Sequence, residues 1–161
     1  MTVTSVEKDL DSLTLTVTAE FDAPVERVWD LWSDPRKLER WWGPPGYPGT
    51  VEEHNLVPGG SVTYYMTSPK GEKHRGWWKV ESVDAPTSLV VIDGFADKDG
   101  NPIDGMPVST MHMQLIDAGG RTRMEVRSVF GSREQMEQVI SMGVEEGIRQ
   151  SMGQMDALLA A

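Results

Sequence analysis

Between residues 50 and 130 the chain alternates apolar and polar residues in short segments, and Gly, Pro and Asp cluster between these segments. Period-two alternation is typical of half-buried strands, and the intervening clusters predict tight turns. We expect strands over residues 50–57, 62–66, 73–83, 89–96, 110–116 and 121–130. Strands joined by short turns run antiparallel, so the pattern predicts a curved antiparallel meander.

One strand and two short helices are expected before this meander. Residues 13–21 alternate as a strand, and Pro24 suits the first turn of a helix that follows it. Asp34 is placed to cap a second helix, which ends at the Gly and Pro residues of 43–46. The apolar stripes of the two helices contain Val25, Val28, Trp29, Trp32, Leu38, Trp41 and Trp42.

The last and longest predicted element is a helix that runs from Ser132 almost to the C-terminus. Ser132 and Gln135 fit a capping box. Apolar residues then keep a 3.6-residue period through Met136, Val139, Ile140, Val144, Ile148, Met152, Met155, Leu158 and Leu159. Gly143 and Gly147 are four residues apart and stack on one face of such a helix. Either sheet backbone approaches that face closely, or the glycines leave room for a ligand.

Composition excludes several classes of protein. The chain has 161 residues, no Cys, 15 Lys and Arg and 25 Asp and Glu, which gives a formal net charge of -10. Disulfide scaffolds, thiolate nucleophiles and Cys-ligated metal sites are therefore excluded, and binding to nucleic acid or to an anionic membrane is not expected. Without a signal peptide or a long apolar run, we expect a cytoplasmic protein. We expect one domain over 1–161, with its core at about 12–159 and a short extension at 1–11.

Several short motifs recur in the order and spacing of one known group. They are Phe21-Asp22-Ala23-Pro24, Val28-Trp29, Trp32, Asp34-Pro35, Leu38, Trp41-Trp42-Gly43-Pro44, Pro58-Gly59-Gly60, Gly76, Leu89-Val90, Gly119-Gly120-x-Thr122, Gly143, Gly147 and Leu158. Together they span nearly the whole chain. On these residues the chain resembles the START-like (SRPBCC, helix-grip) superfamily. Within it, the resemblance is to single-domain bacterial members of the branch named after the activator of the ninety-kilodalton heat-shock chaperone's ATPase (AHSA-type).

The resemblance implies an α+β helix-grip fold. In that fold a curved antiparallel sheet of six to seven strands wraps around a long C-terminal helix, two short helices follow the first strand, and a deep apolar cavity separates sheet and helix. It does not imply one function, because relatives include lipid carriers, polyketide cyclases and a co-chaperone domain. The eukaryotic-type co-chaperone carries an additional domain before this one, whereas barely a dozen residues precede the first expected strand here. Asn55 also departs from the acidic residue often found in this branch.

Alternation assigns one face of each strand to the expected cavity. The predicted ligand-binding residues are Trp41, Trp42, His54, Tyr64, Met66, Trp78, Phe95, Met111, Met113, Met124, Gly143 and Gly147. Glu52, Asp93 and Ser128 are expected as further polar groups on that lining. A neutral His54 imidazole has the chemistry of a general acid or base, and Glu52 would hold its tautomer. These two residues are the candidate catalytic pair, and the alternative is that His54 hydrogen-bonds a neighbouring side chain or a water and takes no part in chemistry.

No metal or cofactor is expected. Asp97, Asp99 and Asn101 occupy the odd positions of a calcium loop, but Pro102 and Val108 do not fit its later positions. The leading functional hypothesis is a carrier or sensor that binds a small apolar or aromatic molecule. The alternatives are a cofactor-free cyclase, dehydratase or isomerase, a protein-partner role such as regulation of a chaperone ATPase, and a stress-response role. Trp77 is a candidate contact for a homodimer.

Overall fold

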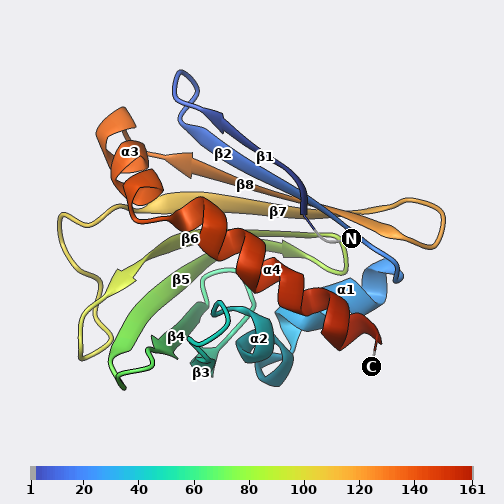
Figure 1. Cartoon of the computed structure of the whole chain (residues 1–161), viewed down its shortest axis with the longest axis horizontal. Helices are drawn as coiled ribbons and strands as arrows, with labels where there is room; N and C mark the ends of the chain where they lie inside the picture. Colours follow the sequence, from blue (N-terminus) through green and yellow to red (C-terminus); the bar gives the residue numbers. More distant parts are fainter. Residues whose placement is uncertain (1–2, 161) are drawn as a thin grey trace.

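A computed structural model of the chain describes residues 3–160 and shows one antiparallel sheet with helices on one side (Figure 1). The strands are β1 (Val3–Asp9), β2 (Thr14–Phe21), β3 (Gly49–His54), β4 (Ser61–Thr67), β5 (Lys73–Asp84), β6 (Ser88–Ala96), β7 (Ser109–Asp117) and β8 (Thr122–Phe130). The helices are α1 (Val25–Ser33), α2 (Pro35–Trp41), α3 (Arg133–Ser141) and α4 (Val144–Ala160). The predicted α+β helix-grip fold is confirmed.

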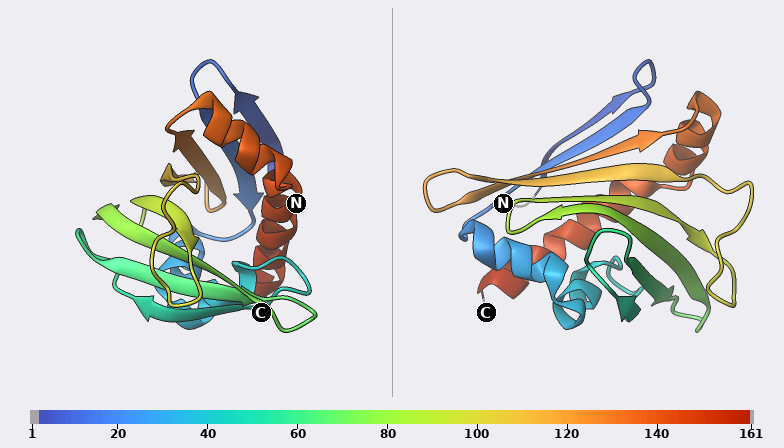
Figure 2. Two further views of the ribbon diagram at one scale, coloured as in Figure 1. Left: turned by 90° about the vertical axis from the view of Figure 1, so that its left-hand side faces the viewer. Right: turned by 180° about the vertical axis from the view of Figure 1, so that it is seen from behind.

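The strand order across the sheet is β1-β2-β8-β7-β6-β5-β4-β3. The strands from β3 to β8 form the expected meander, and α1 and α2 carry the chain from β2 to the opposite edge at β3. The sheet curves, and α4 lies across the concave side of the sheet (Figures 1 and 2). Helices α1 and α2 lie beside the C-terminal half of α4. This arrangement places the inward-facing side chains of the central strands opposite a helix.

Within residues 3–160 the sheet has eight strands rather than six to seven, because β1 forms the edge beside β2. Residues 1–11 were expected to be an extension, and of these the described part, 3–11, contributes this strand. Its sequence is polar and its side chains are only half-buried or exposed, so it lacks a strong alternating signal. The turn after it is closed by Asp9, whose Oδ1 accepts hydrogen bonds from the N–H groups of Asp11 (3.0 Å) and Ser12 (3.2 Å). Backbone pairing with β2 therefore determines this strand.

The predicted single C-terminal helix is two helices, which corrects the sequence-based expectation. Ser132 caps α3 as expected, because its hydroxyl accepts a hydrogen bond from the N–H of Gln135 at 3.1 Å. The chain then leaves the helical conformation at Gly143, which has a φ of 81° and donates its N–H to the carbonyl of Ile140. Glycine adopts this left-handed conformation without a steric penalty, so it ends α3 and lets α4 start in a new direction.

The main core lies between the inner face of the sheet and helices α1, α2 and α4. Trp32, Trp41 and Trp78 are fully buried there, and Trp41 donates its indole N–H to the carbonyl of Leu31 at 2.8 Å. Asp34 caps α2 as predicted by accepting the N–H of Arg36 at 2.9 Å. In the part of the chain that the structure describes, no helix is long and apolar enough to cross a membrane.

Candidate ligand-binding cavity

A cavity of about 380 Å³ lies between the inner face of the sheet and α4. Strands β4 to β8 supply one wall, α3 and α4 supply the other, and the Trp residues of the α1–α2 region supply one end. The volume is within the range of about 300–1,000 Å³ that is typical of small-molecule sites. His74, Phe95 and Met142 line the cavity and are exposed, so they lie where it opens to solvent.

Eight of the predicted ligand-binding residues line this cavity: Trp41, Trp42, Tyr64, Met66, Phe95, Met111, Gly143 and Gly147. Asp93 and Ser128, which were expected as polar groups on the same face, also line it. Trp78, Met113 and Met124 are fully buried but do not reach the cavity, because other side chains of the core cover them. Strand alternation identifies the inward face, but it does not separate the wall of a cavity from solid core.

Helix α4 contributes lining residues that were not named as ligand contacts. They are Ile148, Ser151 and Met152, together with Val144 at the start of the helix. Val144, Ile148 and Met152 belong to the apolar stripe predicted for the C-terminal helix. Their place near Gly147 on that helix could have identified them as cavity residues. Gln154, one turn further on, donates a hydrogen bond to the carbonyl of Gly43 at 2.7 Å and ties α4 to the end of α2.

Aromatic rings form a continuous cluster at one end of the cavity. Trp42 stands edge-to-face against Tyr64 at a centroid distance of 5.7 Å and against Trp78 at 4.9 Å. Trp32 packs similarly on Trp41 at 4.9 Å. These edge-to-face contacts make this end of the cavity a wall of aromatic rings.

A hydrogen bond between two side chains of the described cavity wall joins Tyr64 and Asp93. The Tyr64 hydroxyl donates a hydrogen bond to Oδ1 of Asp93 at 3.3 Å. Tyr64 lies beside Gly76 on β5, and a Cβ at Gly76 would overlap the Tyr64 hydroxyl group. Glycine is therefore required at this position for the Tyr64 ring to cross β5 and reach the carboxyl group on β6.

Burial changes the acidity of both groups in this pair. Asp93 keeps some accessible surface where it lines the cavity, yet burial raises the pKa of its carboxyl to about 7, and the hydrogen bond from Tyr64 lowers this value only in part. Burial and the nearby Asp93 charge hold the pKa of Tyr64 well above its usual range. Hydrogen bonding by the Trp42 and Trp78 indoles counteracts this rise in part. The cavity thus contains a carboxyl group that changes its charge close to neutral pH.

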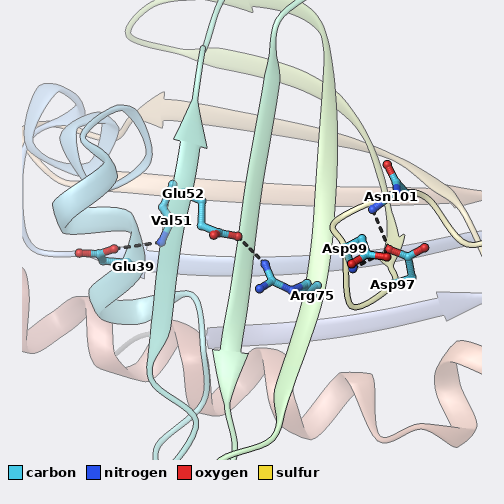
Figure 3. A network of polar contacts seen from close by, with 7 residues as sticks. All are labelled: Glu39, Val51, Glu52, Arg75, Asp97, Asp99 and Asn101. Carbon is cyan, nitrogen blue, oxygen red and sulfur yellow. Dashed lines mark hydrogen bonds and ion pairs between the residues drawn. The ribbon is translucent and has the colours of Figure 1, made fainter.

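His54 and Glu52 lie away from the cavity and do not contact each other. The ladder between β3 and β4 shifts between Val51 and Glu53, so Glu52 leaves the inward face that strict alternation assigned to it. Its carboxylate bonds the Arg75 guanidinium (Figure 3). His54 Nε2 lies 3.1 Å from the carbonyl of Trp32 and donates its proton there, because a carbonyl only accepts. The alternative expected for His54 was a hydrogen bond to a neighbouring side chain or a water, whereas the partner in the structure is a backbone carbonyl.

The acidic loop after β6 forms a turn. Oδ1 of Asp97 accepts hydrogen bonds from the N–H groups of Asp99 at 2.9 Å and Asn101 at 3.0 Å (Figure 3). Within residues 3–160, no cluster of His, Asp and Glu is arranged to hold a metal ion.

Trp77 is half-buried over Gly94 and donates its N–H to the carbonyl of Phe95 at 3.0 Å.

Comparison with known proteins supports the resemblance seen in the sequence. The family model described as "Activator of Hsp90 ATPase homolog 1-like protein" matches residues 22–160. No curated protein matches the chain significantly. A crystal structure from Mycobacterium smegmatis is 51% identical, with a TM-score of 0.91 and coverage of 98% of this chain and 96% of the other.

Two further solved structures show the same fold. A solution structure from Arthrobacter aurescens is 49% identical, with a TM-score of 0.95 over 99% of this chain and 92% of the other. A crystal structure of an AHSA1 protein from Silicibacter pomeroyi is 25% identical, with a TM-score of 0.70 over 91% and 97% of the two chains.

Proposed function

This chain belongs to the family of Activator of Hsp90 ATPase homolog 1-like proteins, and we propose that it binds a small apolar or aromatic molecule in the cavity beneath α4. The observation that carries the proposal is the cavity itself, whose mainly apolar wall of aromatic, Met and aliphatic side chains includes the hydrogen-bonded pair of Tyr64 and Asp93. A rigid apolar wall with few polar groups is the usual construction of a small-molecule site. The fold is compatible with such a role.

The enzymatic alternative would have to use residues other than the pair first considered. His54 is held by a backbone carbonyl and Glu52 by Arg75, and neither lines the cavity. Proton transfer to a bound substrate would therefore fall to Asp93 and Tyr64. No contact of the described residues favours such a reaction over binding alone, so a carrier or sensor remains the proposal.

Filling the cavity from α4 tests the proposal. Gly147 and Gly153 both lie in α4, and a Cβ at either position meets no atom within 4 Å. Only Gly147 lines the cavity, whereas Gly153 is exposed. Gly147→Leu should therefore occupy the space that a ligand needs, and Gly153→Leu is the matched control with the same gain in helix propensity.

The measurement is native mass spectrometry of the purified protein, together with titration calorimetry using naphthalenemethanol as a neutral aromatic probe. We expect bound mass and probe binding in the unmodified protein and in Gly153→Leu, and loss of both in Gly147→Leu. Equal behaviour of the two variants would contradict a ligand site in this cavity.

The same spectra distinguish monomer from homodimer, and a dimer disrupted by Trp77→Ala would support the expected contact.

A further inference from the structure

We propose that the ligand is an organic cation, an apolar aromatic amine whose ammonium group pairs with the Asp93 carboxylate. This inference rests on the proposed function and specifies its ligand class. Three observations support it: the partners of Asp93, the aromatic rings around it and the charge of the whole chain.

Asp93 lacks a positively charged partner. Its Oδ1 accepts from the neutral Tyr64 hydroxyl, and no ion pair found among residues 3–160 includes it. The strand neighbours of Asp93, Trp78 on β5 and Ser109 on β7, are uncharged. A carboxylate in an apolar cavity is unfavourable unless it is paired, so a ligand cation would supply the missing charge.

The basic residues on the described wall do not fill this role. They are His74 and Arg75, both on β5 beyond Gly76. The Arg75 guanidinium bonds Glu52 and lies 4.9 Å from the centre of the Tyr65 ring. His74 is exposed and lies beside the Tyr47 ring, with 6.2 Å between the ring centres. Besides Asp93, the titratable residues that line the described cavity are Tyr64, His74 and Arg75.

The aromatic rings on the wall of the same cavity also favour a cation. Trp41, Trp42 and Tyr64 line the same cavity, and aromatic faces attract ammonium groups through their quadrupoles. The ring system of an aromatic amine would occupy the apolar space between Met111 and Met152, which adapt to a flat body. The formal net charge of -10 adds a field that attracts cations and repels carboxylates such as fatty acids.

The test compares naphthylmethylamine, naphthalenemethanol and naphthoate, which share one ring system and differ in charge. Titration calorimetry at about pH 8, where the amine is protonated and Asp93 is ionised, should show the amine binding about tenfold more tightly than the alcohol. Naphthoate should bind more weakly than either.

Two variants assign this preference to Asp93. Asp93→Asn should abolish the preference for the amine, so that amine and alcohol bind with equal affinity. Glu53→Gln removes the same charge from an exposed position outside the cavity and should keep the preference. Circular dichroism spectra check that both variants fold.

If Asp93→Asn fails to fold, the pH dependence of binding to the unmodified protein tests the same inference. Amine binding should weaken below about pH 7 as the carboxyl is protonated, whereas alcohol binding should not. Equal affinity of amine and alcohol, or tighter binding of the alcohol or naphthoate, would overturn the cation inference and leave the cavity proposal standing. Absence of binding by all three probes, with no bound mass in native spectra, would overturn both.

Discussion

Replacing Asp93 with Asn should stabilise the protein increasingly as the pH rises. Burial raises the pKa of the Asp93 carboxyl from 3.8 to about 7, so the folded state keeps a proton that the unfolded chain has already lost. Between about pH 4 and pH 7 the native state thus binds more protons than the unfolded state, and its free energy of unfolding falls as the pH rises. The amide of the Asp93→Asn variant does not titrate, so the variant lacks this loss.

The structure sets the size of the effect. One pKa unit corresponds to about 1.4 kcal/mol, so ionising Asp93 in the folded state costs at most about 4 kcal/mol. Part of this cost arises below pH 5, and the partial exposure of Asp93 allows solvent to screen the charge. We therefore expect the stability difference between Asp93→Asn and the unmodified protein to grow by about 2 kcal/mol from about pH 5 to pH 8.

Urea unfolding followed by tryptophan fluorescence at both pH values measures this difference. Repulsion among the other acidic groups, which follows from the net charge of -10, is nearly the same in both proteins and largely cancels. A difference that stays constant to within about 0.5 kcal/mol would show that the Asp93 carboxyl is not desolvated in the folded state, and would refute the reasoning.

Three further predictions concern stability and are checked by urea or thermal unfolding. Gly76→Ala should cost about 1–3 kcal/mol, because a Cβ would overlap the Tyr64 ring; a neutral effect would mean that the ring does not cross β5. Ser132→Ala should cost about 1 kcal/mol through loss of the α3 cap, and an unchanged midpoint would argue against that hydrogen bond. Gly147→Ala should stabilise by up to about 1 kcal/mol, whereas Gly143→Ala should destabilise because of its positive φ; the same sign for both would contradict the break between α3 and α4.

Local signals were sufficient for most of the elements. Period-two alternation located the six strands of the meander, and the capping residues Asp34 and Ser132 marked helix starts that the structure contains. Such signals act over a few residues, so they do not depend on the tertiary contacts of the rest of the chain. The strand β1 lacks them, because an edge strand with few buried side chains is held mainly by the backbone of its neighbour.

The polar residues of the site show where such signals end. Asp93 and Ser128 reach the cavity as alternation predicts, whereas Glu52 does not. A single irregularity in the β3–β4 ladder moves Glu52 outward, and one residue of slip changes the face of a side chain. His54 has the chemistry of an acid or base, but its partner is a carbonyl 22 positions away in the chain, which no local pattern indicates.

The sequence alone determined β2, the first two helices, the meander from β3 to β8, the family and the apolar character of the site, because these depend on residue type and short-range spacing. The tertiary structure decided which inward residues line a cavity and which are solid core, because that depends on how α4 is set against the sheet. It also paired Tyr64 with Asp93, 29 positions apart, across the space left by Gly76. The perturbed carboxyl follows from that packing, since burial rather than sequence sets its pKa.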